Sequence, residues 1–435
     1  MPLLVAAGFL ASRALDGDDE TRSVPGTGGV LGATESSRSG RVLVVTPDGD
    51  DGGAGTPASP LRTIGRALSV ARGGARIQVA PGSYPAIRDT RAHARTVRVV
   101  GVGATRPRIA GAELAGARRI RFSRVRFTEP VLIRGDPVQA YRRPSMRIAF
   151  HRSAFRTSES ADAGDACLTI RDRSSFISVR RSKLGHCFSG IVGPGNSPSP
   201  HSRHIRIVRN LIQNVPGDGI QFGEWDDVTI ARNVIRHMRD PEGEIHNDGV
   251  QFVGDSRRVR ITRNRIHDSG GQLVFIQDAF GPIDDVLVSG NLLYGSDAIA
   301  IQNQGATDTR YLYNTIWDTR YGALLLRQGE GGATPRDTVV VGNILETFEA
   351  SEGARARYRD YNLIQQHQGP PAPHERVGLS PRFRNARGGD YRLSRRSPAV
   401  RRGERRWAPR RDLDGRVRRR PPSLGALEYA RPRRR

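Results

Sequence analysis

Short runs of alternating apolar and polar residues fill most of the chain, and a turn residue closes each run. Segments such as "SRRVRITRNRIHDSGGQLVFIQ", which begins at Ser256, and "IDDVLVSGNLLYGSDAIAIQ", which begins at Ile283, fit one template. The template has two alternating apolar positions, a turn with Asn, further apolar positions, a variable loop and a final alternation. Alternation with a period of two predicts β-strands, and no segment between the Asn positions sustains helical i, i+3, i+4 spacing.

The Asn position recurs along the chain and marks a repeated unit. It is filled by Asn210, Asn233, Asn264, Asn291, Asn314 and Asn343, and by Ser153 and Ser182 in two earlier segments. One unit of this length cannot bury its own apolar face, whereas stacked units enclose a continuous core. The pattern therefore predicts an all-β parallel solenoid of about ten coils, with neighbouring strands ~4.8 Å apart. We also expect the stacked Asn amides to form a structural ladder.

The chain divides into three predicted regions. Residues 1–40 join a short apolar run, "MPLLVAAGFLASRA", to a Gly-, Ser- and acid-rich stretch, which indicates a signal-like segment and a disordered linker or, alternatively, a disordered tail. Residues 41–390 form the predicted solenoid, and residues 391–435 form a basic closing segment and tail. We expect a secreted or cell-surface protein without a transmembrane segment, since no apolar run approaches the ~18 residues needed to span a bilayer.

One short helix is predicted near the start of the solenoid. "SPLRTIGRALSVARGG" has Ser59 as a candidate N-cap and Pro60 at the first helical position. Two glycines end the apolar stripe. We expect this helix to plug the open end of the stack, which would otherwise expose core and strand edges.

Three segments resemble a known group of proteins. "VVTPDGDDGGAGTPASPLRTIGRALSVARGGARIQVAPGSY", residues 44–84, is similar to the N-terminal region of secreted right-handed parallel β-helix proteins of the pectate-lyase-like superfamily. "LSPRFRNARGGDYRLSRRSPAV" and "DLDGRVRRRPPSLGALEY" resemble the closing segment common in that group. The resemblance covers residues 41–430 and implies a right-handed parallel β-helix. It also implies action on acidic polysaccharides, at sites on the outer face of one sheet beside the long loops, often with calcium.

Two motifs of that superfamily are missing from the chain. It has neither the arginine-and-proline signature of the best-known pectate lyase family nor the Asp-Pro-His run of alginate epimerases. The resemblance therefore transfers the fold but no single activity.

The net charge of +25 favours an anionic partner or reflects the arginine bias of a GC-rich genome. Lys183 is the only lysine. The arginine-dense region 391–435 has no interleaved aromatic platform, which argues against nucleic acid. We expect an acidic polysaccharide or cell-wall glycan as the partner, and a monomer.

The stretch "EIHNDGVQF", residues 244–252, repeats "VPGDGIQF" from one coil earlier and adds a histidine and more acid. Asp165, Asp218, Asp248 and Asp297 all stand just before a predicted strand, so we expect them in one column. Because oxygen-rich, flexible ligation suits calcium, Asp218, Asp248 and Asp297 are the predicted calcium ligands. The alternative is that each Asp bonds the backbone of its own turn.

Four histidines fall in neighbouring coils on one edge of the predicted rod: His186, His237, His246 and His267. We assign His246 as a general base, Asp248 as its orienter or a metal ligand, and His267 as an acid. Lys183 is the alternative base. A transition-metal site built from His237, His246, Asp248 and His267 lacks the tight spacing such sites show. Polar loop residues without chemistry are the remaining alternative.

A polar strip and a cysteine pair complete the candidates. The strand positions Gln221, Gln251, Gln277, Gln302 and Arg327 are predicted to face outward and to bind sugar hydroxyls and carboxylates, unless they form a solvent-facing ladder. Cys167 and Cys187 stand about one coil apart. A disulfide between adjacent coils is feasible, with two buried thiols as the alternative.

These features favour action on an acidic polysaccharide by proton abstraction, as a lyase or a C5-epimerase. A non-catalytic glycan-binding β-helix is the first alternative. Glycoside hydrolysis is the second, and it requires two facing carboxylates ~5 to 9 Å apart.

Overall fold

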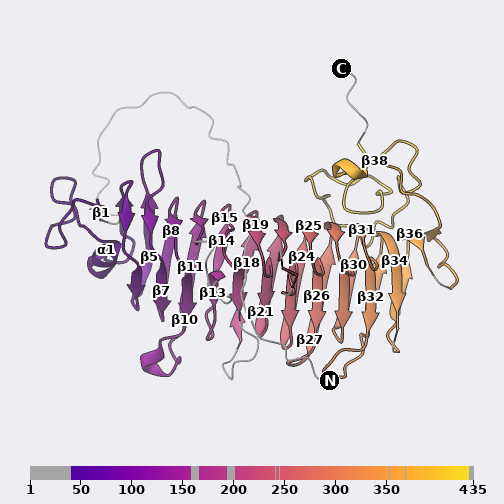
Figure 1. Ribbon diagram of the computed structural model, residues 1–435, viewed down its shortest axis with the longest axis horizontal. Helices are drawn as coiled ribbons and strands as arrows, with labels where there is room; N and C mark the ends of the chain where they lie inside the picture. The colour runs from indigo at the N-terminus through magenta and orange to yellow at the C-terminus, as the bar shows by residue number, and fades with distance from the viewer. Residues whose placement is uncertain are drawn as a thin grey trace, which may run out of the picture.

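The computed structural model describes residues 41–157, 166–193, 201–240, 242–243, 245–351, 353–367 and 369–430. The signal-like region 1–40, Asp165 and residues 431–435 lie outside the described residues. The described chain winds into one long rod of stacked strands, with the N-terminal coils at the indigo end (Figure 1).

The first strand of each coil lies in one parallel sheet, which we call the first face. It is 14-stranded and runs in sequence order along the rod, and β17 (Ser202–Arg203) lies off the main path and pairs with β21. Its other strands are β1 (Val42–Val45), β2 (Arg76–Val79), β5 (Ala92–Gly101), β8 (Arg118–Ser123), β11 (Met146–His151), β14 (Ser178–Arg180), β18 (Arg206–Val208), β21 (Trp225–Ala231), β24 (Ser256–Thr262), β27 (Ile283–Ser289), β30 (Thr307–Leu312), β33 (Thr338–Val341) and β35 (Ala356–Asp360).

The other strands of each coil form a second and a third face, which share β34 and make up one 23-stranded sheet. The second face follows the Asn turn and contains β3 (Ser83–Tyr84), β6 (Arg108–Ile109), β9 (Arg126–Phe127), β12 (Ala154–Phe155), β15 (Lys183–Leu184), β19 (Leu211–Val215), β22 (Val234–Met238), β25 (Arg265–Ser269), β28 (Leu292–Ser296), β31 (Thr315–Thr319), β34 (Ile344–Ala350), β36 (Leu363–Gln366) and β37 (Arg376–Val377). The third face contains β4 (Ile87–Asp89), β7 (Ala112–Ala115), β10 (Val131–Arg134), β13 (Ala166–Ile170), β16 (Ser189–Gly193), β20 (Ile220–Phe222), β23 (Val250–Val253), β26 (Val274–Gln277), β29 (Ile301–Gln304) and β32 (Leu324–Arg327).

The predicted parallel solenoid is confirmed by the register of these strands. Val228, Val259 and Val286 are aligned in three successive coils, and all three are fully buried. Alternate residues point inward, so each coil adds a layer to one continuous apolar core.

The predicted Asn ladder is confirmed along the turn between the first and second faces. The Asn291 side chain accepts hydrogen bonds from the Asn264 backbone N–H at 2.8 Å and from the Asn264 amide at 3.0 Å. It donates in turn to Asn314 Oδ1 at 3.0 Å and to the Ile261 carbonyl at 2.8 Å. Asn362 extends the ladder by one coil beyond the predicted residues. Each amide therefore satisfies buried backbone groups of the coil next to it.

The predicted N-terminal helix is shorter and starts later than expected. Helix α1 (Ile64–Val70) has Thr63 as its N-cap, and the Thr63 hydroxyl accepts from the Arg66 backbone N–H at 3.0 Å. Ser59 and Pro60 are therefore not the cap and first turn. Leu61 instead forms a parallel bridge with Val45, which delays the helix by one turn. The helix lies at the indigo end of the rod (Figure 1), and its role as a plug stays a prediction.

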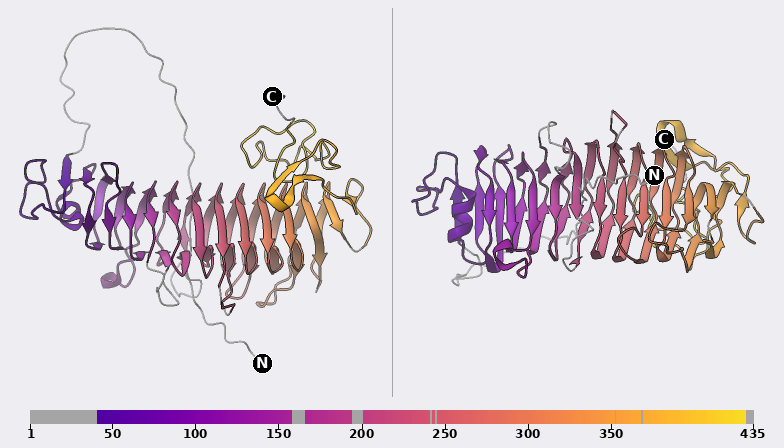
Figure 2. Two further views of the ribbon diagram at one scale, coloured as in Figure 1. Left: turned by 45° about the horizontal axis from the view of Figure 1, so that its top comes forward. Right: turned by 60° about the horizontal axis from the view of Figure 1, so that its bottom comes forward.

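Residues 378–430, which we call the C-terminal segment, fold back on the outside of the second face (Figure 2). They contain the antiparallel pair β38 (Phe383–Asn385) and β39 (Asp390–Leu393). Tyr391 and Leu427 pack against Leu292, and the Tyr391 ring lies 4.7 Å from that of Tyr294. The segment thus covers the second face from β28 onward and leaves the earlier coils of that face open.

The two cysteines join adjacent coils of the rod. Cys167, on β13, and Cys187, which precedes β16, form a disulfide with a Cα–Cα distance of 5.6 Å. This cross-link lies on the third face, in the two coils directly before the coil of Asp218.

Replacing Asn291 by Ala should lower the free energy of unfolding by about 2 to 3 kcal/mol, because buried backbone donors and acceptors lose their partners. Denaturant unfolding followed by circular dichroism measures the change. The matched control is Gln365→Ala, at an exposed position of β36, expected to change stability by less than about 0.5 kcal/mol. Equal, small effects from both substitutions would contradict the structural role of the ladder.

Candidate functional site

Asp218 and Asp248 stand in register just before β20 and β23, at the start of the third face. Their side chains continue a hydrogen-bonded column. Ser189 Oγ accepts from the Asp218 N–H at 3.0 Å, Asp218 Oδ1 from the Asp248 N–H at 2.6 Å, and Asp248 Oδ1 from the Gln272 N–H at 2.6 Å. Each residue therefore caps the next coil, whereas the alternative predicted from the sequence had each Asp bond the backbone of its own turn.

His246 completes a compact cluster with these two carboxylates, which we call the triad. Its Nδ1 lies 3.1 Å from Asp248 Oδ2, and one ligand atom from each of the three residues lies within 4.8 Å of the others. Asp218 and Asp248 are buried, whereas 53% of the His246 side chain is exposed. Burial, together with the neighbouring Asp248 charge, raises the pKa of Asp218 well above its usual value.

The same geometry bears on the role predicted for His246. The adjacent Asp248 carboxylate raises the pKa of His246 to about 9. A higher pKa favours the protonated imidazole at neutral pH, and the role of His246 as a general base stays a prediction.

His267 lies elsewhere, on the outer side of β25, and the triad does not include it. Its ring stacks on Tyr294 with a centroid distance of 4.5 Å, and His237 is 6.2 Å away. Burial and the nearby Arg265 lower the pKa of His267 to about 4. The lowered pKa favours the neutral ring at pH 7, and the role of His267 as an acid stays a prediction.

Asp297 does not join the predicted acidic column. Its carboxylate lies 2.5 Å from an Arg239 guanidinium nitrogen, and Arg239 also binds Asp268. The predicted three-carboxylate calcium site is therefore not assembled. What remains is two carboxylates and one imidazole, and this set departs from the six to eight oxygen ligands typical of calcium.

The predicted glutamine strip divides into two columns on the third face. One column aligns Gln221, Gln251, Phe275 and Gln302, and the next aligns Gln277, Gln304 and Arg327. Gln251 and Gln302 are buried, with 7% and 8% exposed. These two residues are therefore not open to a sugar, whereas Gln221, Gln277 and Arg327 are half-buried, and the role of the strip in sugar binding stays a prediction.

A different surface is both open and charged. A groove of about 940 Å³ runs over the second face in the N-terminal half of the rod, and we call it the basic groove. It is lined by Gly82, Ala104, Thr105, Arg106, Arg108, Arg124, Arg126, Arg152, Ala154, Phe155, Arg156, Arg181, Lys183, Leu184, Gly185, His186, Leu211 and Gln213. No carboxylate occurs among these described residues. Lys183, the predicted alternative base, is exposed within the groove.

The cations of the groove repeat from coil to coil. Arg108 is in register with Arg126, Arg126 with Ala154, and Ala154 with Lys183. Within the described part of the chain, Arg108, Arg126 and Lys183 form no ion pair. Their positive charge therefore stays available to a ligand.

Analysis of the sequence alone missed these arginines because they were counted only in the net charge. The signal was present on either side of the ladder position, where Arg152 precedes Ser153 and Lys183 follows Ser182. Arg152 and Lys183 are both exposed, so a basic residue beside the ladder position in successive coils indicates a cationic stripe.

Comparison with known proteins identifies the fold. The family model "Right handed beta helix region" matches residues 151–316 and 199–357, and a "Protein of unknown function (DUF1565)" model matches residues 47–91. No curated protein matches. The predicted right-handed parallel β-helix is confirmed at the level of fold. Among the described residues, no helix has the length and apolarity to cross a membrane.

Several solved structures are similar at low identity. Pectate lyase Pel9A is 11% identical with a TM-score of 0.41, over 91% of this chain and 98% of that one. The GH136 lacto-N-biosidase from Eubacterium ramulus is 11% identical with a TM-score of 0.47, over 78% and 68%. The A-module of the Azotobacter vinelandii mannuronan C-5 epimerase AlgE4 is 15% identical with a TM-score of 0.35, over 73% and 91%. At these values the similarity concerns the fold and assigns no activity.

The lowered pKa of His267 predicts a loss of stability in acid. The unfolded chain takes up a proton on this histidine below its usual pKa of ~6.5, whereas the folded chain does so only near pH 4. Its contribution is therefore complete above pH ~6.5 and lost as the pH falls to about 4. His267→Gln should flatten the wild-type decline between pH 7 and pH 4.5, measured by urea unfolding. Parallel stability profiles for the two proteins would contradict the buried, neutral state of His267.

Proposed function

We propose that this right-handed parallel β-helix of the pectate-lyase-like type binds an acidic polysaccharide in the basic groove and acts on it by proton abstraction, as a lyase or C5-epimerase. The observation that carries the proposal is the groove itself. It is open, it repeats cations along the rod, its described lining has no carboxylate, and it holds the only lysine of the chain.

Recognition would rest on the match between a repeating anion and a repeating cation. Strands of successive coils are ~4.8 Å apart, so Arg108, Arg126 and Lys183 offer positive charge at multiples of this spacing. Guanidinium groups bind carboxylates with two parallel hydrogen bonds. A polyuronate lying along the rod would therefore meet a cation at most coils, whereas a neutral glycan would gain little from this surface.

Lys183 replaces His246 as the proposed base because it is the amine within the groove. A neutral amine would remove the proton from the sugar carbon that bears the carboxylate. The electron pair then spreads onto that carboxylate, where Arg126 or Arg152 would stabilise the added negative charge. In elimination the pair forms a carbon–carbon double bond, the bond to the leaving sugar oxygen breaks, and that oxygen takes up a proton. In epimerisation a proton returns to the same carbon from the opposite side.

Glycoside hydrolysis receives no support from the groove, because its described lining lacks the two carboxylates that reaction needs. Non-catalytic glycan binding uses the same charges as the proposed reaction. The experiments below separate it from catalysis.

Binding should depend on the groove arginines. The double substitution Arg108→Glu and Arg126→Glu should weaken binding of an oligouronate at low salt by roughly 10-fold or more, measured by calorimetry on a panel of pectate, alginate and glycosaminoglycan fragments. The control is Arg257→Glu, which reverses an exposed charge on the first face. Equal affinity in the groove variant and the control would contradict this binding site.

Catalysis should depend on the amine of Lys183 and not on its charge. Lys183→Arg keeps the positive charge, so we expect binding within about 2-fold of wild type but turnover lowered ~10² to 10⁴-fold, because a guanidinium cannot give up its proton. Ultraviolet absorbance of the unsaturated product detects elimination, and proton NMR detects epimerisation. Full turnover by Lys183→Arg would remove Lys183 as the base. Retained binding without turnover of any uronate by the wild type would favour the non-catalytic alternative.

A further inference from the structure

The triad contains a buried carboxylate oxygen that lacks a normal partner. The Oδ1 atoms of Asp218 and Asp248 each accept a backbone N–H from the next coil. Asp248 is fully buried, yet its Oδ2 accepts no hydrogen bond with acceptable geometry. His246 Nδ1 lies 3.1 Å from this oxygen. Two buried carboxylates side by side are costly unless a cation stands between or beside them.

We infer that Asp218, His246 and Asp248 bind a divalent transition metal of the zinc type, and not calcium. One ligand atom from each residue lies within 4.8 Å of the others, so a single ion can contact all three after a small movement of the half-exposed imidazole. Three protein ligands that leave a further position open are characteristic of zinc-type sites.

The donor chemistry selects the class of metal. Imidazole nitrogen is a common ligand of zinc, copper, iron and nickel, whereas calcium takes oxygen ligands only and usually six or more of them. The third carboxylate that a calcium site would need, Asp297, is bound to Arg239. The chain therefore supplies an imidazole where calcium would require further oxygen atoms.

The surroundings hold two of the ligands in place before the ion arrives. The Asp218 and Asp248 carboxylates are fixed by the backbone hydrogen bonds of adjacent coils, and Gln272 lies beside the imidazole. Such outer contacts orient ligands and raise metal affinity. None of the three ligands lines the basic groove, so this site stands apart from the proposed polysaccharide reaction.

The test uses the full chain, stripped of metal with a chelator and then dialysed. Titration with Co²⁺ should give visible absorption bands that saturate at one equivalent per chain, and Zn²⁺ should remove them, whereas Ca²⁺ in excess should not. His246→Ala should weaken Co²⁺ and Zn²⁺ binding at least ~10-fold. Removing only an outer partner of a metal ligand already lowers affinity by about this much, and His246 is itself a proposed ligand. Asp248→Asn is the second variant, because it can still accept the Gln272 N–H while it loses the charge.

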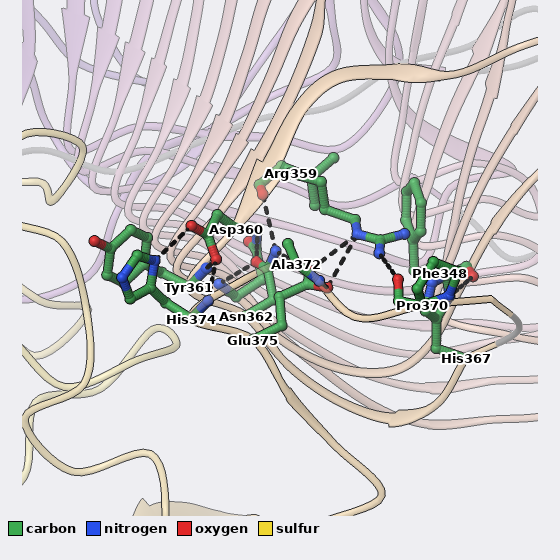
Figure 3. Close-up of polar contacts among 12 residues, drawn as sticks. Phe348, Arg359, Asp360, Tyr361, Asn362, His367, Pro370, Ala372, His374 and Glu375 are labelled. Atoms are coloured by element: carbon green, nitrogen blue, oxygen red, sulfur yellow. Dashed lines mark hydrogen bonds and ion pairs between the residues drawn. The ribbon is translucent and has the colours of Figure 1, made fainter.

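His374→Ala is the matched control. His374 Nδ1 lies 2.8 Å from Asp360 Oδ2, and its side chain is 56% exposed, so this pair resembles His246–Asp248 (Figure 3). Among the described residues, the pair belongs to no group of three metal ligands. The substitution should leave the metal titration unchanged. Calcium bound as tightly as zinc, equal losses in His246→Ala and His374→Ala, or no saturable binding to the stripped wild type would each overturn the inference.

Discussion

Buried backbone groups at the corner of every coil must find hydrogen-bond partners, and this requirement governs the whole rod. A parallel solenoid pairs its strands with the neighbouring coils, but the turn between two faces leaves N–H and C=O groups inside the protein. The Asn ladder satisfies them one coil at a time. Asn291, for example, accepts from Asn264 and donates to Ile261. Because the ladder fixes the register of each coil, it also fixes which side chains become neighbours on the outside.

The same requirement produces a second column at the start of the third face. This column contains ionisable side chains. Ser189, Asp218 and Asp248 each cap the next coil with a side-chain oxygen. A serine or amide would fill this role without charge. The two aspartates instead bring negative charge into the interior beside His246, which is why that corner combines a structural column with a candidate metal site. The basic groove lies on another face, so the rod separates its acidic corner from its cationic surface.

The fold could be predicted from the chain because its signal repeats. The spacing of the Asn positions and the alternation around Val259 and Val286 give the coil, its strands and the ladder. The triad was found in part, since His246 and Asp248 are two residues apart in sequence and Asp218 is one coil away. The protonation preferences of His246 and His267 could not be predicted, because they depend on burial and on the charge of particular neighbours. Asp297 was misplaced because loop length between the second and third faces varies from coil to coil.

The main functional claim is that an acidic polysaccharide lies along the second face over Arg126 and Lys183. The most direct measurement is a crystal structure of the Lys183→Arg variant with an acidic oligosaccharide bound. The account predicts sugar carboxylates in contact with guanidinium groups of the basic groove, with the sugar ring over β12 and β15. An oligosaccharide bound only on the third face beside His246, or on the first face, would contradict it.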